Sequence, residues 1–118
     1  MRDLITPFAI VPVTPNGHHL LHNAGFHFKT VKDPSGDDMY VVPLRTWGIV
    51  EADLKDFAMF HCTEPVAYVR CDNSAYLEAP KTGKRVEMGI FKKITKAQAD
   101  LTSYFVMDPH SGRYYDVV

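Results

Sequence analysis

Four of the chain's six histidines lie within ten residues, at His18, His19, His22 and His27. Imidazole is the commonest metal ligand among side chains and titrates near neutral pH. Whether these residues can act together depends on the local backbone. If residues 16–24 form a short helix, His18 and His22 share one face at positions i and i+4, as metal ligands on helices do.

The Asn16-Gly17 pair supports a different conformation, because Asn-Gly is a strong signal for a tight β-hairpin turn. In a hairpin, the residues from His18 to His22 would form a strand. The imidazoles of His18 and His22 would then lie roughly 13 Å apart, at about 3.3 Å per residue, which is too far for one metal ion to bridge. We favour the hairpin and keep a zinc site built from His18, His22 and His61 as an alternative.

The two cysteines, Cys62 and Cys71, match neither a CxxC motif nor a zinc-ribbon spacing. His61 precedes Cys62, but adjacent residues of a helix do not face each other, so the pair is not a catalytic dyad. Alternation with Ala67 and Val69 predicts that Cys71 is buried and inert. The sequence holds no P-loop, GxGxxG, GxSxG, HExxH or EF-hand motif. It therefore leaves enzymatic activity undecided and favours a non-catalytic protein that needs no cofactor.

Charge is unevenly distributed along the chain, although the net charge is only −1. Positions 33 to 64 contain seven acidic and two basic residues, and positions 81 to 96 contain six basic residues and one acidic residue. The basic segment 81–96 makes nucleic-acid binding a second alternative, with Phe91 and Tyr76 available to stack on bases. In a regular strand, Phe91 would point away from Val86, Met88 and Ile90 and would be exposed.

Protein binding is the function that we favour. Tyrosine and arginine are the residue types enriched in interface hot spots, and both occur in the C-terminal hairpin. The chain would then be a small accessory or inhibitory protein of the kind encoded by phages or mobile elements, a class expectation without a motif behind it. The predicted contact residues are Lys84, Arg85, Lys92, Lys93, Arg113 and Tyr114.

Residues 1–118 are predicted to form one globular domain, since the length and the apolar content suit a single core. Alternating apolar residues between Gly, Pro and Asp turns indicate strands, while helical spacing of apolar residues indicates helices at 51–61 and 95–105. Thr95-Lys-Ala-Gln98 fits a capping box at the start of the second helix, with Thr95 as N-cap and Gln98 reaching back to it. The fold class predicted is α+β, with a mostly antiparallel, curled or barrel-like sheet of six or seven short strands. The expected strands are 8–13, 26–31, 39–44, 66–71, 75–78, 86–91 and 114–118.

The expected location is the cytoplasm. The N-terminal apolar stretch is short and interrupted by proline, unlike a signal peptide. No apolar run approaches the ~18 residues of a membrane-spanning helix. The sequence gives neither the partner nor the oligomeric state.

Overall fold

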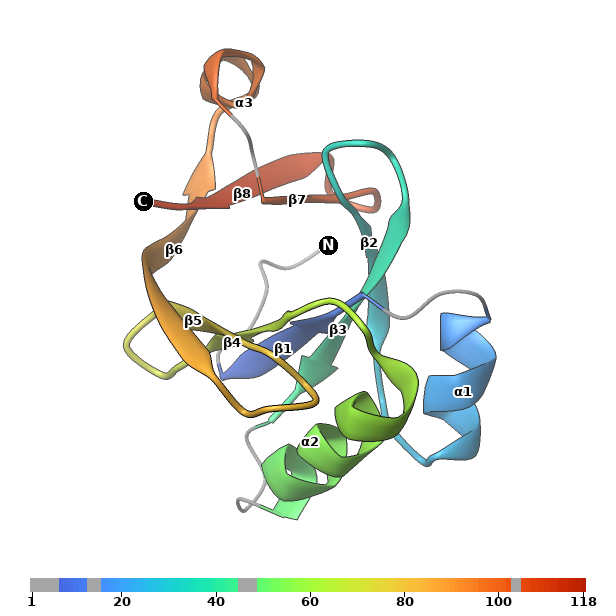
Figure 1. Ribbon diagram of the computed structural model, residues 1–118. Coiled ribbons are helices and arrows are strands. Elements are labelled where there is room, and N and C mark those ends of the chain that lie inside the picture. The colour runs from blue at the N-terminus through green and yellow to red at the C-terminus, as the bar shows by residue number, and fades with distance from the viewer. Residues whose placement is uncertain (1–6, 13–15, 45–48, 103–104) are drawn as a thin grey trace.

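Eight antiparallel strands close into a barrel, with three short helices beside it, in the part of the chain that the structure describes (Figure 1). The structure is a computed structural model and describes residues 7–12, 16–44, 49–102 and 105–118. In chain order the elements are β1 (Phe8–Val11), α1 (Gly17–Asn23), β2 (Lys29–Lys32), β3 (Asp38–Pro43), α2 (Ile49–His61), β4 (Val66–Val69), β5 (Ser74–Glu78), β6 (Arg85–Ile94), α3 (Lys96–Leu101), β7 (Val106–Asp108) and β8 (Arg113–Val117).

The strands follow one another around the barrel in the order β1-β3-β2-β7-β8-β6-β5-β4. β1 closes the ring, because Ala9 lies opposite Val42 of β3 on one side and opposite Tyr68 of β4 on the other. The predicted α+β class and barrel-like antiparallel sheet are confirmed. The predicted number of six or seven strands is one or two too low. The strand absent from the predicted list is β7, whose three residues are too few to show a period of two.

Three strands, β1, β3 and β4, are buried on both faces, which explains their unbroken apolar runs. Their inner side chains fill the barrel, and their outer side chains pack under α1 and α2. In β1, for example, Phe8 and Ile10 point inward while Ala9 and Val11 point outward. The buried residues of the interior are Phe8, Ile10, Val31, Val41, Ala67, Val69, Ala75, Phe91, Val106 and Tyr115.

The helix α2 covers the barrel with the apolar face that the sequence predicted. Leu54, Phe57 and Ala58 are buried against the strands, whereas Asp53 and Asp56 face solvent. The helix begins two residues before the predicted start and ends at the predicted residue, His61. No helix in the described segments is long and apolar enough to cross a membrane.

The helix α3 begins with the predicted capping box. The Thr95 hydroxyl accepts a hydrogen bond from the Gln98 amide at 3.1 Å, and the Gln98 side chain accepts one from the Thr95 amide at 2.8 Å. The predicted end at residue 105 is wrong, because the helix stops at Leu101. There Thr102 adopts an extended backbone and its hydroxyl donates to the Gln98 carbonyl.

The predicted hairpin at residues 16–24 is also wrong, because this segment is the helix α1. Its C-terminus has a complete Schellman motif: the Phe26 amide donates to the Leu21 carbonyl, and the Gly25 amide donates to the His22 carbonyl. Gly25 supplies the positive φ of 86° that this motif requires. Burial of Leu21 against the barrel, together with this cap, outweighs the turn preference of Asn-Gly.

Candidate functional site

The histidine cluster lies on the surface of α1. His18 and His22 are exposed and share a helix face by their spacing, while the rings of His18 and His19 lie 4.0 Å apart. His61 is on a different helix, with its ring 4.6 Å from that of Phe57. Among the described residues, no three His, Cys, Asp or Glu side chains are arranged to hold a metal ion. The helix thus supplies the pair that zinc would need, without a third ligand placed beside it.

The two cysteines have opposite environments. Cys62 is buried, and burial raises the pKa of its thiol to about 11, so it is a poor nucleophile at neutral pH. The prediction that Cys71 is buried is wrong. β4 ends at Val69, and a turn follows in which the Asn73 amide donates to the Arg70 carbonyl. The turn takes Cys71 out of the strand alternation and leaves it exposed.

The six predicted contact residues form two groups, and they do not form a single patch. Lys84 and Arg85 lie at the start of β6, whereas Lys92 and Lys93 lie near its other end, up to ~30 Å away at about 3.3 Å per residue. Tyr114 is opposite Ile94, so β8 places Arg113 and Tyr114 beside the second group. No described carboxylate forms an ion pair with Lys84, Lys92 or Lys93.

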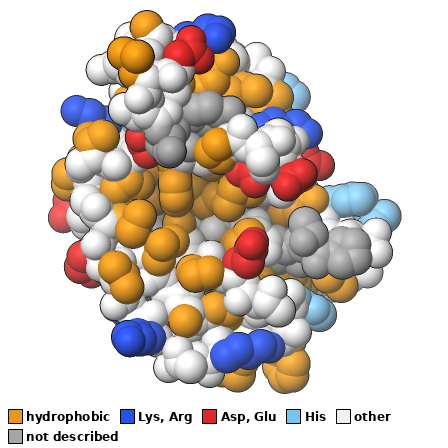
Figure 2. Space-filling view, turned by 45° about the horizontal axis from the view of Figure 1, so that its top comes forward, with side chains coloured by type: hydrophobic (Ala, Val, Ile, Leu, Met, Phe, Trp, Pro, Cys, Tyr) orange, Lys and Arg blue, Asp and Glu red, His pale blue; other side chains and the backbone are white. Residues whose placement is uncertain are grey.

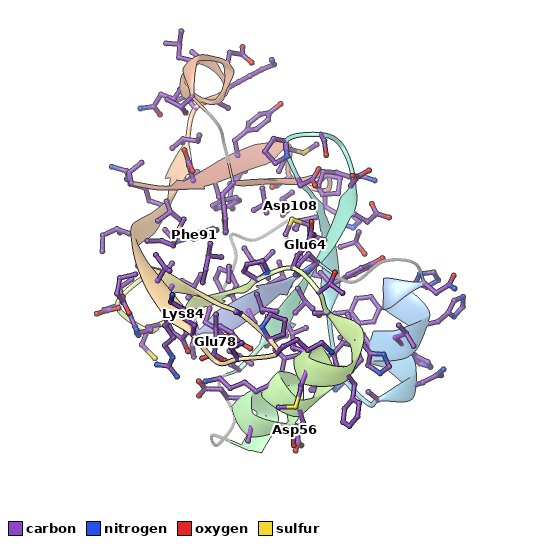
Figure 3. The ribbon with its side chains drawn as sticks, in the orientation of Figure 1. Asp56, Glu64, Glu78, Lys84, Phe91 and Asp108 are labelled. Atoms are coloured by element: carbon purple, nitrogen blue, oxygen red, sulfur yellow. The ribbon has the colours of Figure 1, made fainter. Side chains whose placement is uncertain are left out.

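The predicted facing of β6 is wrong beyond Met88. Phe91 is 5% exposed and lies inside the ring of strands (Figure 3), whereas Val86, Met88 and Ile90 are 57%, 41% and 45% exposed. The cause is a β-bulge: Tyr76 of β5 is opposite Glu87 and Ala75 is opposite Gly89, so Met88 has no partner in the register. One extra residue reverses the alternation beyond it.

The bulge and the packing also weaken the nucleic-acid hypothesis. Phe91 fills the barrel, and Tyr76 is 3% exposed, so neither of the two aromatic rings expected to stack on bases is accessible. The basic segment thus offers charge for phosphate contacts, without an exposed aromatic ring at either of these two positions.

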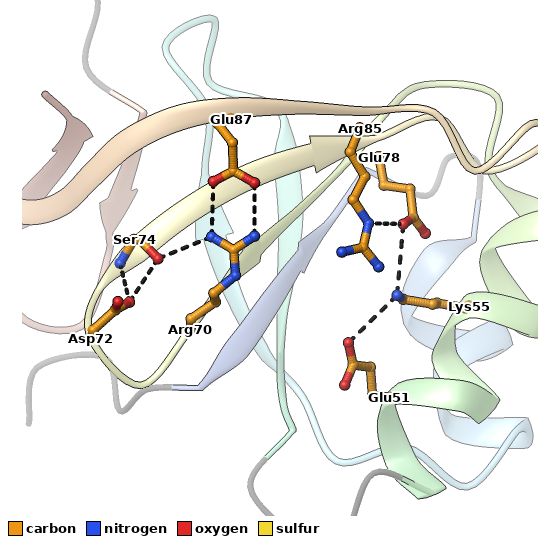
Figure 4. A network of polar contacts seen from close by, with 8 residues as sticks. All are labelled: Glu51, Lys55, Arg70, Asp72, Ser74, Glu78, Arg85 and Glu87. Atoms are coloured by element: carbon orange, nitrogen blue, oxygen red, sulfur yellow. Dashed lines mark hydrogen bonds and ion pairs between the residues drawn. The ribbon is translucent and has the colours of Figure 1, made fainter.

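A network of ion pairs on the outer face of β5 and β6 explains why Tyr76 is hidden (Figure 4). The guanidinium groups of Arg70 and Arg85 each lie 4.5 Å from the centre of the Tyr76 ring. Arg70 makes two hydrogen bonds to Glu87, at 2.9 and 2.8 Å, and Arg85 makes one to Glu78 at 2.9 Å. Arg85, a predicted contact residue, is therefore part of the fold.

The same network joins the barrel to α2. Glu78 is 8% exposed and also pairs with Lys55 of α2 at 3.6 Å. Burial, and the negative charge of Glu78 close by, raise the pKa of Tyr68, whose ring is stacked on Tyr76 at 5.2 Å. The carboxylate is thus used for structural pairing, and Tyr68 stays protonated at neutral pH.

One end of the barrel is open to solvent and apolar. A hollow of about 240 Å³ is lined by residues from both sides of the opening, including Ile10, Met39, Pro65, Ala67, Leu77 and Phe105. Glu64 is the carboxylate at its rim. In Figure 2, apolar side chains gather in a hollow at the middle of this face. Val86 lies opposite Leu77 and so extends the same surface along β6.

Sequence reasoning did not find this apolar opening. Its lining comes from segments that are far apart in the chain, and no local pattern indicates which of them meet. The signal that was available is the apolar alternation of Val86, Met88 and Ile90, which was interpreted as the core face of a strand.

A second hollow, of about 480 Å³, lies where α1 ends and α2 begins. Its lining includes two titratable groups, His27 and Asp53, beside Phe26, Val42 and Val50. It contains no cysteine, serine or second carboxylate among its described lining residues, so it offers no nucleophile to pair with the histidine.

Comparisons of the chain with known protein families, with characterised proteins and with solved structures gave no match. What the protein does therefore has to be inferred from its own residues. Of the features described above, the exposed apolar side chains of β6 and the opening beside Val86 are the ones that neither packing nor pairing among the described residues accounts for.

Proposed function

We propose that this chain is a small, non-catalytic protein-binding module that contacts its partner through β6. The observation that supports this proposal is that three apolar side chains of β6, Val86, Met88 and Ile90, are 41–57% exposed. Val86 shares the face of Leu77 beside the barrel opening, whereas Ile90, beyond the bulge, lies on the outer face. Exposed apolar surface that continues into an apolar hollow is typical of interaction sites, because it costs free energy in water. In β1 and β4, every comparable side chain is buried.

The distribution of lysines along β6 also supports this strand as the contact surface. Lys84 lies before these apolar residues in the chain, and Lys92 and Lys93 lie beyond them, none of the lysines with an ion-pair partner among the described residues. Unpaired cations around an apolar centre attract an acidic partner and mainly raise the association rate. Arg113 and Tyr114 border the second group of lysines. A protein partner of ordinary interface size can cover both groups at once.

The accessory or inhibitory role and the cytoplasmic location belong to this proposal. A protein of this kind acts by covering a surface of its target, and it needs no reactive group of its own. The low nucleophilicity of Cys62 is compatible with such a role.

Capture of a partner by the untagged chain tests the proposal. The chain is coupled to a resin and exposed to lysate of its source cells, with and without chelator and nuclease, and bound proteins are identified by mass spectrometry. We expect a stoichiometric protein that survives both treatments and is lost with the double variant Val86→Ser, Met88→Ser. The matched control is Leu101→Ser on α3, because Leu101 is 86% exposed and lies outside the proposed surface.

The outcomes separate the alternatives. A partner lost with chelator would favour the zinc hypothesis, and one lost with nuclease and steeply with salt would favour nucleic-acid binding. Equal capture by the double variant and by the wild type would remove β6 from the interface.

A further inference from the structure

β6 has a strand neighbour on one side only along its first half. Residues Arg85 to Ile90 pair with β5, and residues Phe91 to Ile94 pair with β8. The last hydrogen bonds with the C-terminal segment are made at Ile90, whose amide donates to the Val118 carbonyl at 2.7 Å, and the Val118 backbone also lies against Gly89. Among the described residues, no strand pairs with the other edge of residues 85–89.

An open strand edge presents backbone N–H and C=O groups that can pair with an added strand. Proteins usually protect such edges with proline or with charged side chains. Residues 85–89 contain no proline. Their charged side chains, Arg85 and Glu87, lie on the outer face, where they pair with Glu78 and Arg70. This edge therefore remains suited to strand addition.

The apolar hollow lies beside this edge. Val86 shares the face of Leu77, which lines the hollow from β5, and Phe105 lines it from the segment before β7. Every second side chain of a strand added along β6 would point to the same face as Val86 and Leu77. A volume of about 240 Å³ is below the usual size of a small-molecule site, so it suits apolar side chains better than a separate ligand.

Two charged groups define the chemistry of the occupant. Lys84, which pairs with no described carboxylate, stands at the start of the open edge and favours a carboxylate near that end of the added strand. Glu64 at the rim of the hollow disfavours a carboxylate in the middle of the strand. The occupant is thus apolar at alternate positions and acidic at the Lys84 end.

We propose that the open edge of β6, residues 85–89, binds an extended peptide segment of a partner protein by strand addition, with apolar side chains of that segment entering the barrel opening. This inference rests on the proposed function, since it specifies how the same surface binds its partner. No covalent chemistry is involved.

Peptide selection on the intact chain tests this inference. Random peptides of about twelve residues, displayed on phage, are selected against the full chain, and the enriched sequence is synthesised and its affinity measured by fluorescence anisotropy. We expect enriched peptides with apolar residues at alternate positions and an acidic end. Methylation of alternate backbone amides on the peptide's pairing edge should weaken binding by at least about tenfold, because it removes the hydrogen bonds to β6.

Matched variants locate the bound peptide. Val86→Lys should weaken peptide binding by about tenfold, whereas Leu101→Lys should change it less than about twofold. Lys84→Glu should weaken it, and Lys93→Glu, at the far end of β6, should not. Hydrogen exchange of the wild-type chain gives a readout that needs no variant: amides within 85–89 should become protected when the peptide binds.

Three results would overturn the inference: no enrichment of alternating sequences, an affinity unchanged by methylation of either set of alternate amides, or no protection within 85–89. If a protein partner is nevertheless captured and depends on Val86 and Met88, the proposed function stands and strand addition is wrong. If Lys93→Glu weakens the protein partner and leaves the peptide unaffected, the peptide segment is one part of a wider interface.

Discussion

β4 and β6 are both rich in apolar residues, yet they differ in what covers them. All four residues of β4 are buried, the outer ones under the helices. In β6, Phe91 and Ile94 are buried, while Val86, Met88 and Ile90 are about half exposed. The apolar residues of β4 therefore stabilise the fold, and those of β6 are available to a partner. Apolar content alone does not distinguish these two uses.

The largest effect on stability is expected on the covered side of the barrel. Leu54 of α2 is fully buried against the outer face of the strands, so Leu54→Ala should lower the free energy of unfolding by about 4 kcal/mol. Urea denaturation monitored by circular dichroism measures the change. Met59→Ala on the same helix is the control, because Met59 is 48% exposed and should cost less than about 0.5 kcal/mol. Equal losses would mean that α2 does not stabilise the barrel by covering it.

The next largest effect on stability is expected from breaking an ion pair on the side of the barrel that α1 and α2 leave uncovered. Asp108 of β7 is fully buried and accepts hydrogen bonds from the Lys29 ammonium at 2.5 Å and from the His110 amide at 3.0 Å. Asp108→Asn leaves the Lys29 ammonium without its counter-ion and should cost about 3 kcal/mol. Thermal denaturation at pH 7 provides the measurement.

The same pair sets a pH dependence. Burial alone would raise the pKa of Asp108, but the hydrogen bonds from Lys29 and His110 outweigh it and hold this pKa below its ordinary value. A lowered pKa contributes stability above the unfolded pKa of about 3.9, and this contribution is lost as the pH falls through the lower folded pKa. Wild type should therefore lose more stability than Asp108→Asn between neutral pH and pH values below about 4. Parallel curves for the two proteins would show that the pair does not contribute.

A smaller effect is expected at the cap of α1, on the covered side. Gly25→Ala should destabilise the protein by about 1 kcal/mol, since alanine disfavours the positive φ of 86°. The cause is the backbone conformation alone, because no atom lies within 4 Å of an added Cβ there. Asn23→Ala, within the same helix turn, should be close to neutral. Thermal denaturation of the two variants separates a cap effect from a general loss of helix.

The smallest effect on stability is expected on β6, where the effect on binding should be largest. The double variant Val86→Ser, Met88→Ser should change the free energy of unfolding by less than about 0.5 kcal/mol per site, because both side chains are already about half exposed to water. Urea denaturation of this variant and of Leu54→Ala compares the free energy of unfolding contributed by β6 with that contributed by the covered side of the barrel. A loss of several kcal/mol would show that these residues belong to the core, and the contrast with β4 would disappear.

Local patterns predicted much of the fold. The alternation of apolar residues indicated an antiparallel, barrel-like sheet, and helical spacing together with the Thr95 capping box indicated α2 and α3. α1 was missed because Asn16-Gly17 carries a strong turn signal, whereas the stabilising contacts of Leu21 come from distant strands. The signal for its Schellman motif was present in the sequence: a glycine, Gly25, is followed by an apolar residue, Phe26, that can contact Leu21 in the last helical turn.

The candidate site was harder to predict. A single unmatched residue, Met88, reverses the facing of β6, and a bulge has no period of its own to detect. The sequence analysis grouped Lys84 with Lys93 in one predicted contact surface, because closeness in sequence does not show that a long strand separates two side chains. The opening of the barrel depends on which strands become neighbours, which is a property of the whole topology.

The position of β8 in the ring has a consequence for how the protein is made. β8 is the last of the described strands in chain order, and it pairs with both β6 and β7 to complete the barrel. Until its residues leave the ribosome, the ring of Phe91 lacks the Tyr115 ring that stacks on it at 5.4 Å. The barrel therefore cannot close until residues 113–117 have left the ribosome, and its interior stays exposed while the seven preceding strands emerge. A nascent chain stalled before residue 113 would be a client for chaperones.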